Sequence, residues 1–360
     1  SYPELAEKVL AGFLTDYSAD FLHTATASTY GAAFGGKAGE TVKVRDGLYS
    51  LELWHGPTCA FKDYALQLMP KLLVEAKKML GRTETTRILV ATSGDTGKAA
   101  LAGYADLDGI EIEVFYPNDG TSEIQHLQMA TQKGENVQVY AVQGNFDDAQ
   151  TGVKKVFADA DVAAELEKRG IRLSSANSIN WGRLVPQIVY YFYAYFRLAE
   201  QGAVEWGKPV DFCVPTGNFG DILAGYYAKQ MGLPVGRLVC ASNKNNVLTD
   251  FLRTGTYTVD AETLAKIQQS FAAGYADDAD GAAEIKARFD GDHYLCDTHT
   301  AVAFRVAETR RTDAPMVVLS TASPFKFPRD VLTARGGEAP ASDFAAMAAL
   351  TAETGAEAPA

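Results

Sequence analysis

Apolar runs that suit buried strands alternate along the chain with segments of helical spacing. In the first half, the strand-like runs are 87–91, 111–116, 137–142 and 172–174, and the helix-like segments that follow them are 98–105, 122–131, 147–168 and 181–201. In the second half, 211–214, 238–241 and 316–319 are strand-like, and 221–231 and 261–289 are helix-like. Strands separated by helices of this length predict parallel sheets with right-handed crossovers.

The two ends of the chain add less regular segments. The spacing predicts a helix over 2–17, a short β pair at 42–44 and 49–54, and one long helix over 62–80. The Ala-, Glu- and Pro-rich tail beyond Gly336 is expected to pack weakly. We therefore predict an α/β fold with two doubly wound parallel-sheet domains. The predicted division is an N-terminal helical and β segment (1–60) packing on the larger domain, a smaller α/β domain (61–201) and a larger α/β domain (202–360).

Composition narrows the classes of function. The chain has 360 residues, 47% of them hydrophobic, and a net charge of −12. Nucleic acid or an anionic membrane requires concentrated basic surface, so neither is an expected partner. The four cysteines stand far apart, without zinc spacing, which predicts reduced thiols and no metal. The sequence begins without a Met or a signal-like segment, and we expect a cytoplasmic protein.

A glycine-containing turn at 214–221 follows one predicted strand and precedes a helix. Its sequence is Val-Pro-Thr-Gly-Asn-Phe-Gly-Asp. Backbone N–H groups that converge at such a turn, with the positive end of the helix dipole, suit a phosphate. The alternative is a tight turn whose glycines only serve a positive φ.

A second turn of this kind, Ala-Thr-Ser-Gly-Asp-Thr-Gly-Lys, spans 91–98. Its Gly-Lys pair resembles a nucleotide P-loop, but Thr92 stands where the first glycine of that motif is required, and Ala99 follows the lysine. A kinase is therefore disfavoured. The turn suits a carboxylate, or else Asp95 or Thr96 simply caps the helix.

A lysine lies in the third segment, His-Gly-Pro-Thr-Cys-Ala-Phe-Lys-Asp at 55–63. Lys62 stands beside Ala60, Phe61 and Tyr64, and partial desolvation there would lower its pKa and make the amine nucleophilic toward an aldehyde. A single lysine is usually a solvated surface residue, so the residue types alone leave both readings open.

Taken together and in order, these segments resemble pyridoxal-phosphate enzymes of the tryptophan-synthase-β fold type (fold type II), and in detail threonine synthases. The matching strings are HGPTCAFKD at 55–63, ATSGDTG at 91–97, GNFDDAQ at 144–150, SSANSINWGRLVPQIVYYF at 174–192, PTGNFGD at 215–221, SNKNNVLTDF at 242–251 and STASPFKF at 320–327. The resemblance covers about 2–330, nearly the whole chain.

The resemblance implies a role for each matching residue. Lys62 would form the Schiff base with pyridoxal 5′-phosphate and later move protons at the substrate's Cα. The cofactor would be bound by Lys62, Gly217, Asn218, Phe219, Gly220 and Asp221, with Thr321 facing its pyridine nitrogen. Ser93, Gly94, Asp95 and Thr96 would receive the substrate's carboxylate. Ser178, Asn180 and Arg183 would bind the phosphate of O-phospho-L-homoserine, the implied small-molecule substrate of a monomer or homodimer.

Alternatives to this activity remain open at this stage. One is another lyase of the same fold type, a threonine dehydratase or a phospholyase. A dehydratase has no phosphate to bind, and the segment with Ser178, Asn180 and Arg183 therefore argues against it. Another is a cofactor-binding homologue with impaired catalysis. The chain lacks a Gly- and Pro-rich N-terminal region and a segment after Tyr257 that threonine synthases usually carry, and Thr298 stands where proline is usual.

Overall fold

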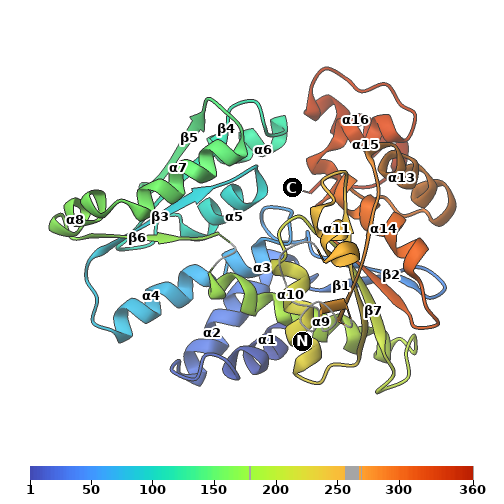
Figure 1. Cartoon of the computed structure of the whole chain (residues 1–360), viewed down its shortest axis with the longest axis horizontal. Helices are drawn as coiled ribbons and strands as arrows, with labels where there is room; N and C mark the ends of the chain where they lie inside the picture. Colours follow the sequence, from blue (N-terminus) through green and yellow to red (C-terminus); the bar gives the residue numbers. More distant parts are fainter. Residues whose placement is uncertain (178–179, 256–266, 269, 360) are drawn as a thin grey trace.

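The computed structural model describes residues 1–177, 180–255, 267–268 and 270–359. These residues form two separate β-sheets with helices packed around them (Figure 1). The predicted α/β fold with parallel sheets is confirmed, with one antiparallel pair, β1 and β2, at an edge.

The larger sheet combines the start of the chain with its second half. Its order is β1 (Glu40–Arg45), β2 (Leu48–Glu52), β10 (Met316–Ser320), β7 (Val210–Pro215), β8 (Val235–Ser242) and β9 (Phe271–Tyr275). The pairs from β2 through to β9 are all parallel. Every residue of β10 is buried, as expected of a central strand covered on both faces.

The smaller sheet is parallel throughout and lies at the upper left of Figure 1. Its order is β5 (Val137–Val142), β4 (Ile110–Pro117), β3 (Thr85–Ala91) and β6 (Ile171–Ser175). The helices that connect these strands are α5 (Asp95–Tyr104), α6 (Glu123–Ala130), α7 (Phe146–Ala158) and α8 (Ala160–Lys168). Alternate residues of β4 are buried, which matches the two-residue period of a strand.

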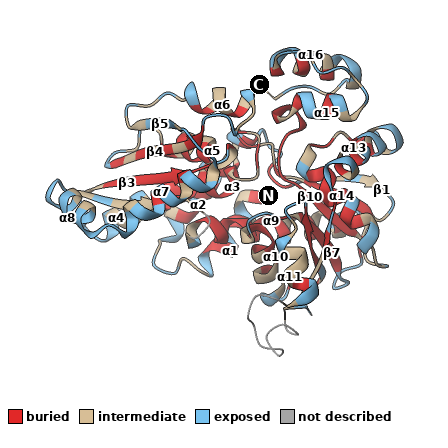
Figure 2. Ribbon diagram, turned by 45° about the horizontal axis from the view of Figure 1, so that its top comes forward, coloured by how far each residue is buried: buried red, intermediate tan, exposed pale blue. Residues whose placement is uncertain are grey.

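A largely buried helix, α9 (Trp181–Glu200), lies at the centre of the chain's main core. It packs against α1 (Tyr2–Ala11), α3 (Asp63–Leu66) and α10 (Gly220–Gln230). The ring of Tyr2 meets the rings of Tyr30, Tyr64 and Tyr193 at centroid distances of 5.0, 5.5 and 5.0 Å. Tyr30 belongs to α2 (Ala19–Tyr30), so aromatic packing fixes both N-terminal helices to the core, shown buried in Figure 2.

Four predicted helices differ in the structure. The helix expected over 2–17 ends at Ala11. The single helix over 62–80 is two, α3 and α4 (Met69–Met79), because Pro70 cannot donate an amide hydrogen to a continuous helix. Likewise, 147–168 forms α7 and α8, which meet at Asp159. The helix expected over 261–289 lies partly outside the described residues, and the rest holds the strand β9 as well as α13 (Asp278–Asp292).

The expectation that the tail packs weakly is wrong. Its helix α16 (Asp343–Thr354) buries Ala346 and Leu350 completely and packs on α15 (Pro328–Ala334) and α6. The other helices among the described residues are α11 (Val247–Thr254) and α14 (Thr298–Arg310), with short 3-10 turns η1 (Ala32–Phe34) and η2 (Pro324–Lys326). No helix among the described residues is long and apolar enough to cross a membrane.

The predicted boundaries fall between elements of the two sheets. The four strands of the smaller sheet lie within 61–201, and those of the larger sheet lie before and after that range. Helix α9, placed by the prediction with the smaller domain, also packs against α10. The division into domains stays a prediction.

Candidate active site

The segments singled out in the sequence all leave the carboxyl ends of parallel strands. Lys62 follows β2, the 321–323 segment follows β10, and the 216–219 turn follows β7. The 92–94 turn and the 176–180 segment follow β3 and β6 of the smaller sheet. Carboxyl ends of parallel strands share one edge of a sheet, and ligands of α/β proteins bind at that edge.

The loop that carries Lys62 is joined to the segment that carries Thr321. The Phe61 amide donates to the Thr321 carbonyl at 2.9 Å, and the Ser323 amide donates to the Cys59 carbonyl at 3.0 Å. An isolated antiparallel bridge between Ala60 and Ala322 lies between these bonds. The structure therefore brings together the segments of Lys62 and Thr321, two residues that stand 259 positions apart in the sequence.

Lys62 has the electrostatic environment of a nucleophile. Burial of the ammonium, and then the neighbouring Arg183, lower the pKa of Lys62 to about 7. Asp95 and Asp221 act in the opposite direction, and Lys326 adds to the lowering. The Nζ atom also lies 3.7 Å from the centre of the Phe61 ring. An amine with this pKa is about half neutral at pH 7 and can attack an aldehyde, unlike a solvated surface lysine.

The 217–220 turn is open toward the outside of the sheet. Gly217 and Asn218 are exposed, and a Cβ added to Gly217 would meet no atom within 4 Å. Gly217 and Gly220 are not among the residues with positive φ. Neither backbone conformation nor packing therefore requires glycine at position 217, and the open space there lies at the start of α10, the end of a helix that suits an anion.

Asp221, predicted as a cofactor contact, bonds to α9 through one carboxylate oxygen, and its Oδ2 meets no donor among the described residues. Its Oδ1 accepts from the hydroxyls of Tyr190 at 2.6 Å and Tyr191 at 3.0 Å, which ties α10 to α9. Burial raises the pKa of Asp221 to about 6, against these two hydrogen bonds and the charge of Lys62. Because Lys62 and Asp221 each shift the other's pKa, the lysine and the turn are electrostatic neighbours.

The 92–97 turn is fixed by one side chain. The Thr92 hydroxyl accepts from the amides of Gly94 at 3.0 Å and Gly97 at 2.9 Å. Gly94 has a φ of 143°, and a Cβ there would lie 2.5 Å from the Gln125 side chain, so no other residue type fits. With the Gly94 amide engaged, the amides of the 93–96 turn left without an acceptor among the described residues are those of Ser93, Asp95 and Thr96.

Neither Asp95 nor Thr96 caps α5 with its side chain. The N-cap residue is Gly94, and the Asp95 carboxylate instead binds Lys326 and Gln125, at 2.6 and 2.9 Å. Burial alone would raise the pKa of Asp95, but the Lys326 ammonium and the hydrogen bonds outweigh it and keep that pKa below its usual value. The capping alternative considered from the sequence is therefore wrong.

The three residues predicted to bind a substrate phosphate have different environments. Arg183 is buried and donates from Nη1 to the Ala176 carbonyl at 2.6 Å. Among the described residues no acceptor meets its Nε. Asn180 caps α9, accepting from the Gly182 amide at 2.9 Å and donating to the Ser175 carbonyl at 3.2 Å. Ser178 lies outside the described residues.

Arg183 is therefore a buried cation whose Nε has no acceptor among the residues that the structure describes. Burial lowers its pKa to about 10, which leaves the guanidinium charged at neutral pH. A buried charge without an anionic partner is costly unless a ligand supplies one. Asn180 differs, because its Oδ1 and one N–H of its Nδ2 already bond to the backbone, which leaves the second N–H for a ligand.

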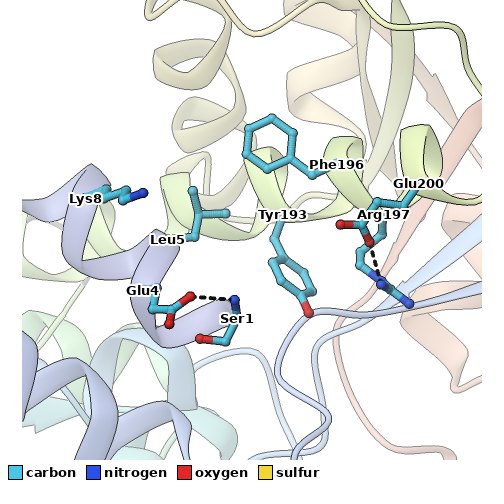
Figure 3. Close-up of a pocket in the computed structure, with 8 residues that line it drawn as sticks. All are labelled: Ser1, Glu4, Leu5, Lys8, Tyr193, Phe196, Arg197 and Glu200. Carbon is cyan, nitrogen blue, oxygen red and sulfur yellow. Dashed lines mark hydrogen bonds and ion pairs between the residues drawn. The ribbon is translucent and has the colours of Figure 1, made fainter.

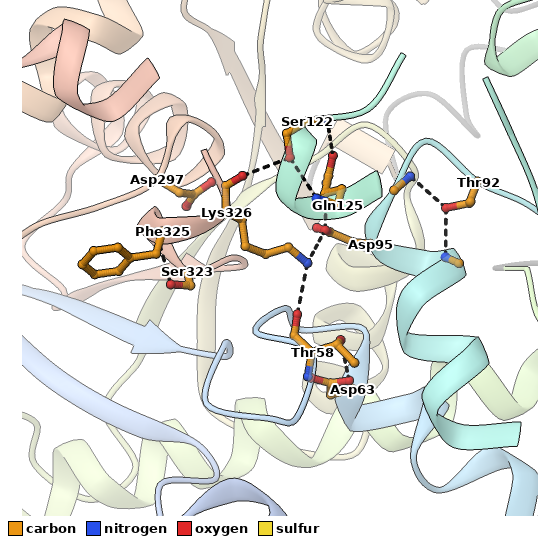
Figure 4. Close-up of polar contacts among 12 residues, drawn as sticks. Thr58, Asp63, Thr92, Asp95, Ser122, Gln125, Asp297, Ser323, Phe325 and Lys326 are labelled. Carbon is orange, nitrogen blue, oxygen red and sulfur yellow. Dashed lines mark hydrogen bonds and ion pairs between the residues drawn. The ribbon is translucent and has the colours of Figure 1, made fainter. Parts of the chain in front are cut away.

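Sequence reasoning missed Lys326, which stands in the STASPFKF string but was given no role. Its side chain is 2% exposed and lies at the centre of the contacts in Figure 4. The available signal was a lysine between Phe325 and Phe327 in a segment that already carried Thr321.

Two hollows of the surface lie away from the predicted site residues. One lies between α1 and α9, with Ser1 and Glu4 paired at the start of α1 and Arg197 and Glu200 paired on α9 (Figure 3). None of the predicted site residues lines it. Among the described residues no group of His, Cys, Asp or Glu could hold a metal ion.

Comparison with known proteins identifies the class. The family profile described as pyridoxal-phosphate dependent enzyme matches residues 38–320, and a threonine synthase C-terminal profile matches 300–354. Fold and site thus define a pyridoxal-phosphate-dependent enzyme.

Threonine synthase of Pseudomonas aeruginosa is 37% identical over 94% of this chain and 81% of its own length. The crystal structure of pyridoxal-phosphate-bound threonine synthase from Brucella melitensis superposes with a TM-score of 0.85 at 34% identity, covering 94% of this chain and 81% of that one. The chain belongs to the threonine synthase family.

Another relative is considerably longer. Human threonine synthase-like 1 is 37% identical over 79% of this chain, but the match covers 46% of that protein. The chain thus spans about half the length of this curated relative.

The residues present fit the cofactor. Lys62 is a partly neutral amine, Gly217 leaves open space at a helix N-terminus, and Arg183 Nε lacks an acceptor among the described residues. These features correspond to the aldehyde and phosphate of pyridoxal phosphate and to an anionic substrate.

Proposed function

We propose that this chain converts O-phospho-L-homoserine and water into L-threonine and phosphate. The observation that carries the proposal is the position of the Lys62 amine, whose pKa is lowered. Its loop is bonded to the Thr321 segment, and the turns at 92–97 and 217–220, both suited to anions, accompany it. In the reaction a C–O bond at Cγ breaks and phosphate leaves. A Cβ–H bond also breaks, the oxygen of water bonds to Cβ in place of that hydrogen, and Cγ gains a proton.

Pyridoxal phosphate, when bound, supplies the electron sink for carbanions at the substrate carbons. Lys62 would hold it by its aldehyde and, once released, would remove and return the proton at Cα. The 217–220 turn would hold its phosphate, and the Thr321 hydroxyl would face its ring nitrogen. A hydroxyl there, rather than a carboxylate, leaves that nitrogen less protonated.

The substrate's two anionic groups would bind on the smaller sheet. Its carboxylate would accept from the amides of Ser93, Asp95 and Thr96, and its phosphate from Arg183. The planar guanidinium fork suits phosphate, and its charge stabilises the leaving group as the Cγ–O bond breaks. Closure of the smaller domain on the larger one would keep stray water out of the site.

A threonine dehydratase is the second candidate, and Arg183 argues against it. A dehydratase substrate carries no phosphate, which would leave the buried guanidinium without an anion. A phospholyase shares the phosphate and differs in its product.

Product analysis separates these activities. The purified chain with added cofactor is incubated with O-phospho-L-homoserine, and phosphate, threonine and 2-ketobutyrate are measured. We expect phosphate and threonine in equal amounts. Phosphate with 2-ketobutyrate would indicate a phospholyase, whereas cofactor absorbance without phosphate release would indicate an impaired homologue. Lys62→Ala is the control and should release no phosphate.

We also propose a cytoplasmic protein that is a monomer or a homodimer. The four cysteines, three of them buried and none in a disulfide, support a reducing compartment. Light scattering of the purified chain measures the oligomeric state.

A further inference from the structure

A buried lysine outside the roles given above links the two sheets. Lys326 lies at the end of η2, just after β10 of the larger sheet, and is 2% exposed. Its Nζ lies 2.6 Å from Asp95 Oδ1 and donates to the Thr58 carbonyl at 3.0 Å (Figure 4). Burial of a lysine is costly unless its charge is paired, so this position has a specific partner.

The partners of Lys326 belong to the two loops that the reaction needs. Asp95 is the first residue of α5, in the turn proposed to bind the substrate carboxylate. Thr58 bonds to Asp63, the residue after Lys62, through its amide and its hydroxyl, both at 2.8 Å. One ammonium therefore connects the carboxylate turn to the loop of the nucleophilic lysine.

A second contact joins the backbone of Lys326 to the smaller sheet's helices. The Ser122 hydroxyl, at the start of α6, donates to the Lys326 carbonyl at 3.2 Å. Gln125 of the same helix donates to Asp95 Oδ1 at 2.9 Å. Asp95 is thus held on one oxygen by a cation and an amide from two different directions.

The ion pair also decides the charge of the carboxylate turn. Without Lys326, the Asp95 carboxylate would stand uncompensated beside the free amides of Ser93 and Thr96. A like charge at that place repels an incoming carboxylate. With Lys326 in place, the positive end of α5 remains available to an anion.

We propose that Lys326 is a positioning residue that neutralises Asp95 and fixes the carboxylate-binding turn against the Lys62 loop. The role at the substrate rests on the function proposed above. The link to Lys62 does not, because it concerns only groups of this chain. Among the described residues, the titratable groups that interact with Lys62 include Arg183, Asp95, Asp221 and Lys326, and also His299.

The first experiment measures Lys62 itself and needs no turnover. The cofactor-free full chain is treated with an amine-acylating reagent from pH 5 to 10, and acylation of Lys62 is followed by peptide mass spectrometry. The wild-type midpoint is expected near the lowered pKa of about 7. Lys326→Met should raise the midpoint by about one unit, because a cation is lost and Asp95 is no longer neutralised. Asp95→Asn should lower it.

Kinetics then test the carboxylate turn. In Lys326→Met we expect KM for O-phospho-L-homoserine to rise about tenfold or more, with kcat changed less, because a freed carboxylate opposes binding. The double variant Asp95→Asn with Lys326→Met should restore KM to within about threefold of Asp95→Asn alone, since both charges are then gone. The dissociation constant of L-threonine from the holoenzyme, measured by calorimetry, should rank these variants in the same order as KM.

Two further variants keep the result interpretable. Lys71→Met removes another partly buried lysine, bonded to the hydroxyls of Ser28 and Thr29, and should change neither the midpoint nor KM. Lys326→Arg keeps the charge and should leave the midpoint near that of wild type, even if Lys326→Met folds poorly.

An unshifted Lys62 midpoint in Lys326→Met, or a double variant no better in KM than Lys326→Met alone, would overturn the proposal. A wild-type chain that releases no phosphate would overturn the proposed function instead, and the acylation midpoints would still decide the role of Lys326.

Discussion

Close packing between α5 and the helix of Lys62 depends on one glycine. Gly103 lies on α5, and a Cβ added there would lie 2.0 Å from the carbonyl oxygen of Leu66 and 3.2 Å from Pro70 Cγ. Leu66 is the last residue of α3, which begins directly after Lys62. We predict that Gly103→Ala destabilises the fold and displaces α5 from the lysine helix.

The size of the effect follows from two opposed terms. Alanine stabilises a helix interior by roughly 0.5–1 kcal/mol relative to glycine. A Cβ 2.0 Å from a backbone oxygen cannot be relieved by rotating a side chain, and overpacking of this kind costs about 1–3 kcal/mol or more. We therefore expect Gly103→Ala to lower the free energy of unfolding by about 1–2 kcal/mol.

The chain offers a matched control in Gly152. It lies inside α7, where an added Cβ would meet nothing within 4 Å. The same substitution should there raise the free energy of unfolding by roughly 0.5–1 kcal/mol. Urea denaturation followed by circular dichroism measures both variants. Equal effects of Gly103→Ala and Gly152→Ala would refute the reasoning, because helix propensity alone would then explain both.

Two further predictions concern buried carboxylates. Since the folded state raises the pKa of Asp221 to about 6, its ionisation opposes folding, and the contribution of Asp221 to wild-type stability falls as pH rises from about 4 to 6. Asp221→Asn keeps an acceptor for Tyr190 and Tyr191 without the charge. Its free energy of unfolding in urea, relative to wild type, should therefore rise over that interval by at most about 3 kcal/mol; a constant difference at every pH would contradict this. The Asp343 carboxylate accepts from the Ile124 amide at 3.3 Å and so joins α16 to the start of α6. Asp343→Ala should lower the free energy of unfolding by about 0.5–2 kcal/mol. It should also speed hydrogen exchange in α16 but not in β10.

Local sequence pattern predicted the parts of the fold that local physics determines. Strands such as 111–116 and 316–319 were found because apolar side chains must alternate or fill both faces of a sheet. The β9 strand was missed because its sequence, Phe-Ala-Ala-Gly-Tyr, has no strand periodicity and depends on pairing with β8. Helix α16 was undervalued because burial of Leu350 depends on a partner, α15, that composition does not show.

The candidate site shows the same limit. Each turn could be found by its own glycines and its place after a strand. The Asn180 cap was also readable, because an asparagine directly before a helix usually bonds to its first amides. The pairing of Asp95 with Lys326 could not be predicted from the sequence. The two residues lie in segments that follow strands of separate sheets, and only the tertiary fold makes them neighbours.

The charges around Lys62 explain how an acidic chain can bind anions. The protein carries a net charge of −12, so its long-range field opposes a phosphorylated substrate. Within the site the balance is reversed: Arg183 has no anionic partner among the described residues, Lys326 cancels Asp95, and burial favours the neutral form of Asp221 at low pH. Buried charges are screened much less by salt than exposed ones. Added salt should therefore weaken the unfavourable long-range field more than the local attraction, and KM for the phosphorylated substrate should not rise between low and physiological ionic strength.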